Sequence, residues 1–203
     1  MMKSIKKNLL SVIVCCCFIF MALASSKKRI PNGVFNENKP RGEVISDTLG
    51  CLILNNGERV YGSKIWRQSG AVVKDLVRID GQKFPMKEVK GYYLNGMYYG
   101  RYKTSFPKRV LYGKINIYYM QDWHSATSKT LTEYIYWQKG EDGDFNTLRT
   151  WKHVKQAVKD CPLAYSLANR KNGALRREVK KNEQYLWRIF EIYNNNCKAP
   201  SKK

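Results

Sequence analysis

Residues 42–139 alternate between apolar and polar positions in short runs that are separated by tight reversals. The runs 51–54 and 58–66 flank Asn55-Asn56-Gly57, and Asn-Gly at such a position is typical of a β-hairpin. Asp80-Gly81 and Asn95-Gly96 repeat the signal. Further runs rich in β-branched and aromatic residues are 72–79, 89–94, 97–102, 110–120 and 131–137. The close reversals predict an antiparallel β domain over 42–139, a β-roll or small barrel.

The apolar spacing becomes helical after Gly143. Asp144 or Asn146 is a suitable N-cap for a first helix, one face of which carries Trp151, Val154, Val158 and Cys161. A short helix is expected from Pro162 to about 172, and a longer one from 174 to about 194. Residues 144–197 therefore form a predicted helical subdomain, and the fold class is α+β.

The longest of these helices separates apolar from basic residues. Its apolar residues fall within an arc of about 100°: Leu175, Val179, Leu186, Ile189, Phe190 and Tyr193. The opposite side carries Arg176, Arg177, Lys180, Lys181, Arg188 and Trp187. We predict that this side binds an anionic partner. The alternatives are a merely solvated basic face and a Trp187 that packs on the sheet.

The first 24 residues have the three zones of a cleavable signal peptide. Lys3, Lys6 and Lys7 are followed by an almost wholly apolar run over 9–23, and Ala22-Leu23-Ala24 offers the small side chains that a signal peptidase accepts. The alternative is an uncleaved membrane anchor. Residues 25–41 are expected to be a flexible leader and 198–203 a disordered tail. The expected location is periplasmic, outer-membrane-associated or secreted.

Three cysteines lie beyond the predicted signal, at positions 51, 161 and 197. Export places them where disulfides persist. Cys161 and Cys197 bracket the helical segment, so we predict a disulfide between them, with Cys51 as a buried thiol. The alternative is that all three are small apolar core residues.

Charge is the strongest compositional signal. Without residues 1–24 the chain has 34 basic and 16 acidic residues, a net charge of +18. Such a field predicts attraction to polyanions, among which polysaccharide, lipopolysaccharide and lipid headgroups fit an exported protein. Nucleic acid is disfavoured because the signal peptide directs the chain out of the cytoplasm.

Ten of the 14 tyrosines lie between Tyr92 and Tyr136, including three adjacent pairs. Adjacent strand residues point to opposite faces of a sheet, so each pair places one ring on each face. Outward rings beside Lys90, Arg101, Lys103 and Lys114 can stack on sugars or bases. The alternative is that tyrosine simply fills a half-buried sheet surface.

No catalytic, cofactor-binding or metal-binding residues are predicted. The two histidines, His124 and His153, lack any surrounding signature, and Asp122 with His124 makes only a lone pair of potential metal ligands. Glu141, Asp142 and Asp144 form an acidic loop that lacks the ordered ligands of a calcium site. The glycines are dispersed and form no phosphate loop.

A loose string of short motifs runs from Gly42 to Cys197, through residues 52–62, 88–92, 110–115, 160–163, Tyr193-Asn194 and Cys197. Their order resembles that in a group of small secreted Bacteroidota proteins of unknown function. The resemblance implies a β-rich N-terminal part followed by helices, and it brings no catalytic residue.

These observations favour an exported, non-enzymatic binding or scaffold protein of the cell envelope that engages an anionic surface component or a partner protein. The alternatives are a hydrolase without a recognisable signature and a nucleic-acid-binding protein.

Overall fold

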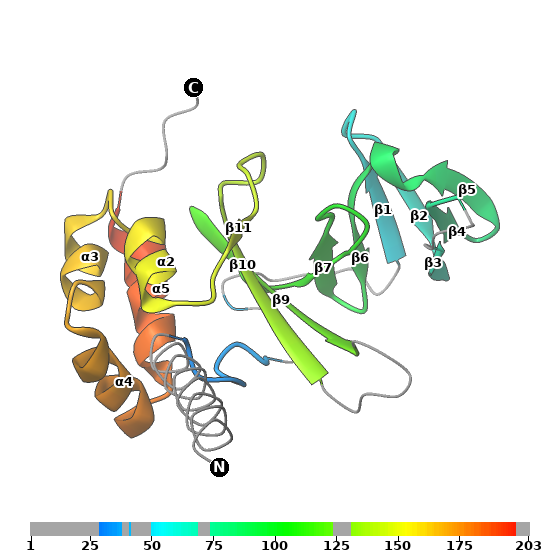
Figure 1. Cartoon of the computed structure of the whole chain (residues 1–203). Helices are drawn as coiled ribbons and strands as arrows, with labels where there is room; N and C mark the ends of the chain where they lie inside the picture. Colours follow the sequence, from blue (N-terminus) through cyan, green and yellow to red (C-terminus); the bar gives the residue numbers. More distant parts are fainter. Residues whose placement is uncertain (1–28, 38–40, 42–49, 69–73, 124–130, 198–203) are drawn as a thin grey trace, which may run out of the picture. The chain divides into compact units, whose positions relative to one another are not determined.

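The computed structural model describes residues 29–37, 41, 50–68, 74–123 and 131–197 (Figure 1). These residues divide into two compact units. The helical unit comprises 29–34 and 149–191, and the β unit comprises the described residues of 35–148 together with 192–197. The predicted signal peptide and C-terminal tail lie outside the described residues.

The β unit contains two antiparallel sheets. In the described residues the larger sheet has eight strands in the order β11-β10-β9-β8-β7-β6-β1-β2, and the smaller has the order β3-β4-β5. The strands are β1 Gly50–Leu54, β2 Arg59–Gly62, β3 Ile65–Gln68, β4 Leu76–Ile79, β5 Gln82–Pro85, β6 Val89–Leu94, β7 Met97–Gly100, β8 Lys108–Leu111, β9 Ile115–Trp123, β10 Leu131–Lys139 and β11 Asn146–Thr147, with a 3-10 turn, η1, at Met86–Glu88. The predicted α+β class, antiparallel sheets followed by helices, is confirmed, and among the described strands the larger sheet is not closed into a barrel.

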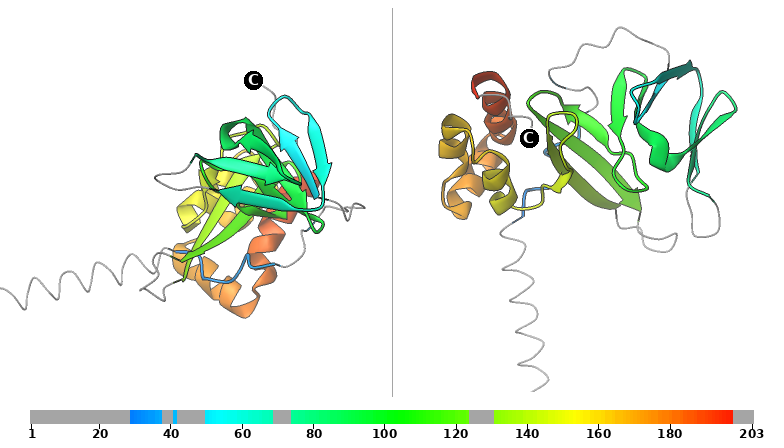
Figure 2. Two further views of the ribbon diagram at one scale, coloured as in Figure 1. Left: turned by 90° about the vertical axis from the view of Figure 1, so that its right-hand side faces the viewer. Right: turned by 90° about the horizontal axis from the view of Figure 1, so that it is seen from above.

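The predicted reversals form the hairpins. Asp80 and Gly81 both have positive φ, as do Asn95 and Gly96, which is the geometry of the turns that suit the twist of paired strands. These turns join β4 to β5 and β6 to β7. Strands β6 to β10 are consecutive neighbours in the larger sheet, and Figures 1 and 2 show the long arrows of β9 and β10 lying side by side.

The predicted run 58–66 divides into β2 and β3 because Asp80 organises a turn between them. Its carboxylate accepts hydrogen bonds from the backbone N–H groups of Ser63 and Lys64, each at 2.9 Å. These bonds lower the pKa of Asp80. The next three strands then form a separate sheet, and β6 returns to pair with β1.

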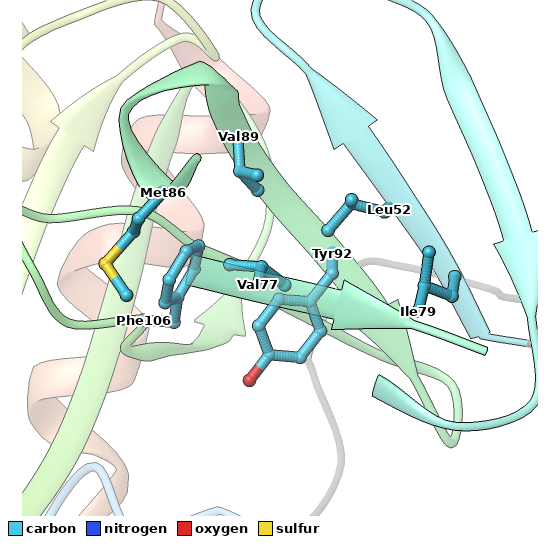
Figure 3. Packing of buried hydrophobic residues seen from close by; sticks show 7 residues of the cluster. All are labelled: Leu52, Val77, Ile79, Met86, Val89, Tyr92 and Phe106. Carbon is cyan, nitrogen blue, oxygen red and sulfur yellow. The ribbon is translucent and has the colours of Figure 1, made fainter. Parts of the chain in front are cut away.

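One hydrophobic core lies between the smaller sheet and strands β1 and β6 (Figure 3). Val77 and Ile79 of β4 meet Leu52 of β1 and Tyr92 of β6. Each of these four residues is at most 6% exposed. The core also contains Met86, Val89 and Phe106.

The helices are α2 Trp151–Ala157, α3 Pro162–Ala168, α4 Asn172–Lys181 and α5 Gln184–Asn196. The first begins after Thr150, and not after Asp144 or Asn146 as expected, because Asn146 and Thr147 pair with β10 as β11. The predicted face of Trp151, Val154, Val158 and Cys161 is fully buried. Figure 1 shows the helices grouped together, in yellow to red.

The long last helix predicted from 174 to 194 is wrong, because the chain breaks at Asn182. Asn182 has an extended backbone, and its Oδ1 accepts a hydrogen bond from the Gln184 N–H at 2.9 Å. Asn182 thus caps the start of α5. The predicted apolar stripe is buried throughout, but it is divided between α4 and α5.

Part of the expected flexible leader is ordered. The Ile30 N–H donates to the Arg149 carbonyl at 3.0 Å, and Arg29 forms a bridge with Thr150. Ile30 and Phe35 are 6% and 0% exposed. Described structure therefore begins at Arg29, ahead of the expected start near Gly42, because two apolar side chains in the leader are buried.

Cys161 and Cys197 form the predicted disulfide. Cys51 is buried in β1 and is not part of it. None of the helices in the described residues is long and apolar enough to span a membrane.

Candidate functional site

The predicted anion-binding residues lie on two helices. Arg176, Arg177, Lys180 and Lys181 of α4 are all exposed, as is Arg188 of α5. Trp187 is only 1% exposed, so the expectation that it faces a partner is wrong. Its indole N–H instead donates to the Val34 carbonyl at 3.0 Å. Trp187 therefore holds the N-terminal segment within the helical unit.

The basic residues and the buried apolar residues of α4 lie on different sides of the helix. At about 100° per residue its four cations span about 140° of the helix circumference. Leu175 and Val179 occupy the other side, at 0% and 2% exposure. Lysine and arginine side chains at this spacing lie on neighbouring turns, so they can engage one extended anion together.

A depression of about 420 Å³ adjoins α4 in the helical unit. Arg176, Val179, Lys180 and Glu183 line one part of it, and residues 31–34 line the other. Because the Trp187 indole binds the carbonyl of Val34, a buried side chain fixes the wall that faces the two cations. The depression gives an anionic group a place beside Arg176 and Lys180.

The acidic residues of the helical unit offset little of its positive charge. Residues 149–191 contain 11 basic and four acidic residues. Among the described contacts, the Glu178 carboxylate forms an ion pair with Arg170 at 3.6 Å. The helical unit therefore keeps a large excess of exposed positive charge.

A second candidate is a pocket of about 610 Å³ in the β unit. Its aromatic lining is Tyr98, Tyr102, Tyr118 and Phe145. Lys90, Arg101 and Lys103 line it together with Glu141, Asp142 and Asp144. The structure thus brings three of the four predicted outward cations to the tyrosine cluster; Lys114 does not line the pocket.

The tyrosine pairs divide between the faces of the large sheet. Tyr92 belongs to the core of Figure 3, while Tyr93 packs on the cluster of Tyr98, Tyr118 and Tyr136. Tyr118 and Tyr119 are both buried, however, so the outward ring of a pair is not always open to solvent. Packing on the sheet surface accounts for most of these rings, and three of them, Tyr98, Tyr102 and Tyr118, also line the pocket.

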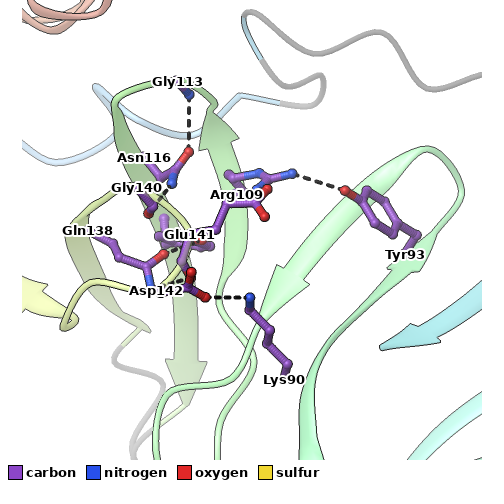
Figure 4. A network of polar contacts seen from close by, with 10 residues as sticks. Lys90, Tyr93, Arg109, Gly113, Asn116, Gln138, Gly140, Glu141 and Asp142 are labelled. Atoms are coloured by element: carbon purple, nitrogen blue, oxygen red, sulfur yellow. Dashed lines mark hydrogen bonds and ion pairs between the residues drawn. The ribbon is translucent and has the colours of Figure 1, made fainter. Parts of the chain in front are cut away.

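Side chains from the strands fix the acidic loop that borders the pocket (Figure 4). The Asn116 amide donates to the Gly140 carbonyl at 2.7 Å, and the Gln138 amide donates to the Gly143 carbonyl at 2.7 Å. Both amides belong to buried residues. The sequence indicated an acidic loop here, and the structure adds that its backbone is held in place by these two amides.

A buried cation, Arg109, contacts the acidic loop. The Arg109 side chain is 1% exposed, and its guanidinium lies over the rings of Tyr98 and Tyr112, at 4.2 and 4.5 Å from the centroids. It donates to the Tyr93 hydroxyl at 3.3 Å and approaches the Glu141 carboxylate at 3.8 Å. These contacts link the acidic loop to the aromatic cluster (Figure 4).

Two buried tyrosine hydroxyls of β9 stay protonated at neutral pH, and that of Tyr118 lines the pocket. Burial raises the pKa of Tyr118, whose hydroxyl donates to the Gln138 Oε1 at 2.8 Å. Burial also raises the pKa of Tyr119, and its hydrogen bond to Glu133 acts in the same direction. Both hydroxyls therefore act as hydrogen-bond donors.

His153, the histidine within the described residues, lines neither the depression beside α4 nor the pocket of the β unit. His153 accepts a hydrogen bond on Nδ1 from the Arg149 N–H at 3.2 Å, and burial lowers its pKa. His124 lies outside the described residues. The described residues contain no group of three or more His, Cys, Asp and Glu side chains arranged to hold a metal ion.

Comparisons with known proteins found no matching family model, no matching curated protein and no matching solved structure. The resemblance to small secreted Bacteroidota proteins therefore stays a prediction.

Sequence reasoning missed two features of these sites. The break before α5 had a signal, since Asn182 is a preferred N-cap residue followed by apolar Tyr185 and Leu186. No sequence signal indicated that residues 31–34 line the depression, because their position depends on a hydrogen bond from the distant Trp187.

Proposed function

We propose that the chain is an exported, non-enzymatic binding protein of the cell envelope that engages an anionic component through the basic surface of its helical unit. The observation that carries this proposal is the exposure of all four cations of α4 opposite its buried Leu175 and Val179. Folding does not use these charges in the core, so they are available to a partner.

Two further observations support the proposal. The disulfide between Cys161 and Cys197 fits an oxidising compartment, in keeping with the signal-peptide pattern of residues 1–24. The depression beside Arg176 and Lys180 offers a place for a sulfate, phosphate or carboxylate group of the partner. That chemistry is common to acidic polysaccharide, lipopolysaccharide and phospholipid headgroups.

The test reverses charge on α4 and compares it with the same reversal elsewhere. One variant carries Arg177→Glu, Lys180→Glu and Lys181→Glu. The matched control carries Lys64→Glu, Lys83→Glu and Lys87→Glu, three exposed lysines of the β unit. Both variants lower the net charge by the same amount, and neither changes a buried residue.

Retention is measured on immobilised heparin, on lipopolysaccharide and on vesicles containing phosphatidylglycerol. The proposal expects a larger loss for the α4 variant than for the control on at least one of these, and the surface on which the difference is largest identifies the source of the anion. Equal losses on all three would show that net charge alone drives retention and would contradict the proposal.

A further inference from the structure

The pocket of the β unit differs in charge from the helical surface and is not explained by anion binding. Three cations and three carboxylates line it, so the lining has no net charge. A polyanion that approached Lys103 would also meet Asp144, and the two effects would largely cancel. The pocket therefore suits a ligand that carries both hydrogen-bond donors and hydrogen-bond acceptors.

Aromatic rings supply the apolar part of the pocket. Tyr102 and Phe145 are half-buried, with ring centroids 5.6 Å apart and planes inclined by 35°. Phe145 also packs on Tyr118 at 4.6 Å, and Tyr102 packs on Tyr136 at 4.5 Å. Both rings are thus held in place by a neighbouring tyrosine ring, and both keep part of their surface exposed.

The polar rim is preformed. Asn116 and Gln138 hold the backbone of the acidic loop at Gly140 and Gly143. Gly143 has no room for a side chain, since an added Cβ would lie 2.3 Å from the Lys139 carbonyl oxygen. Arg101, which also lines the pocket, is held by a hydrogen bond from its Nε to the Val89 carbonyl at 2.6 Å. A fixed rim lowers the entropic cost of binding.

We propose that this pocket binds the ring of an uncharged saccharide. Sugar hydroxyls both donate and accept hydrogen bonds, so they can satisfy the carboxylates of Glu141 and Asp144 and the cations of Arg101 and Lys103 at the same time. The C–H groups on one side of a sugar ring pack on the electron-rich face of an aromatic side chain such as Tyr102 or Phe145. The site is independent of the basic surface on α4.

The test uses an array of neutral and acidic oligosaccharides, followed by titration calorimetry with the neutral oligosaccharide that is best retained. The whole mature chain is used, at 0.1 M and at about 0.5 M salt, where charge attraction is strongly screened. The expected result is binding of at least one neutral oligosaccharide that changes less than about twofold between the two salt concentrations, since no net charge is involved.

Variants connect that binding to the pocket. Tyr102→Leu keeps an apolar side chain but removes the aromatic face, and it should weaken binding at least about tenfold, which corresponds to about 1.4 kcal/mol. Asp144→Asn removes one exposed carboxylate and should also weaken binding. The control Tyr61→Ala removes an exposed ring outside the pocket and should leave binding unchanged.

Three results would overturn the inference: no neutral oligosaccharide is retained, retention disappears at high salt, or Tyr61→Ala weakens binding as much as the pocket variants. Circular dichroism of each variant shows whether it folds, and Asp144→Asn tests the pocket should Tyr102→Leu not fold. The α4 charge-reversal variant should keep its neutral-sugar binding, so this inference and the proposed function can fail separately.

Discussion

The two units carry positive charge in different ways. Residues 149–191 have a net charge of +7 over 43 positions, while 35–148 have a net charge of +5 over 114 positions. In the helical unit the cations of α4 are exposed on one side of a helix, whereas in the β unit Lys90 pairs with Asp142 and Arg109 is buried among tyrosines. The α4 cations are thus clustered and exposed on one helix, whereas Lys90 and Arg109 of the β unit make structural contacts.

This difference shows that net charge alone does not locate a binding site. An exposed cation attracts a partner over roughly 10 Å at moderate salt, but a buried or paired one acts mainly on its neighbours. Five changes, four by substitution and one by pH, test how each unit is built, from the largest expected effect to the smallest.

The largest effect is expected from Trp187→Ala. The side chain is 1% exposed and its indole holds Val34, so its loss should lower the free energy of unfolding by about 3–5 kcal/mol. Denaturant unfolding measures the change. The control Trp187→Phe keeps most of the packing and should cost markedly less. A loss below about 1 kcal/mol for Trp187→Ala would mean that Trp187 does not organise the helical unit.

The disulfide is next. Cys161 and Cys197 close a loop of about 35 residues, for which the chain-entropy model gives about 3–4 kcal/mol. Replacing both by Ala should lower the stability by about that amount, and Cys51→Ala provides the control outside the bridge. Peptide mapping without reductant should find 161 joined to 197. A bridge that includes Cys51 would contradict the account.

Alkaline pH should destabilise the β unit through its buried tyrosines. Burial raises the pKa of Tyr92 from 10.0 to about 12. The unfolded chain releases this proton first, so the native state binds more protons between about pH 10 and 12 and stability falls as pH rises through that interval. Tyr92 alone should contribute about 2 kcal/mol to the fall.

Tyr92→Phe is the control for the alkaline transition, because it removes only the titrating hydroxyl. Unfolding free energies of the two proteins at pH 8 and at pH 11 give the comparison, in which the variant should lose less stability than the native chain. Equal losses in the two proteins would show that the Tyr92 hydroxyl is not buried in solution.

The smallest effects concern the loop that borders the pocket. Asn116→Ala leaves the Gly140 carbonyl without its buried donor and should cost about 1–2 kcal/mol. Asp142→Asn breaks an exposed ion pair with Lys90 and should cost less than about 1 kcal/mol. Denaturant unfolding compares the two. A larger cost for Asp142→Asn would mean that the ion pair, and not the amide network, holds the loop.

Local signals in the sequence predicted most of the architecture. The Asp80-Gly81 and Asn95-Gly96 turns and the apolar stripe from Leu175 to Tyr193 depend on neighbouring residues, and the structure confirms them. The separate three-stranded sheet was not predicted, since it depends on hydrogen bonds that the Asp80 carboxylate accepts from Ser63 and Lys64, 17 and 16 positions away. Trp187 was placed on the basic side because it falls outside the apolar stripe, and its burial depends on a hydrogen bond to the Val34 carbonyl, 153 positions away.

The candidate sites were predicted only in part. The cations of α4 were found because helical spacing alone places them together. The convergence of Tyr102, Lys103 and Asp144 on one pocket was not foreseeable, because strands and loops that are far apart in the chain supply these residues.

The most direct test of the central claim is the salt dependence of binding to one defined polyanion, such as heparin of uniform length. Log of the association constant is measured against log of the salt concentration for the native chain and for the variant Arg177→Ala, Lys180→Ala, Lys181→Ala. If the α4 cations contact the anion, each releases about one counterion, and the slope should become shallower by about three. An unchanged slope, with the affinity of the native chain retained, would contradict the claim that the basic surface of the helical unit is the binding site.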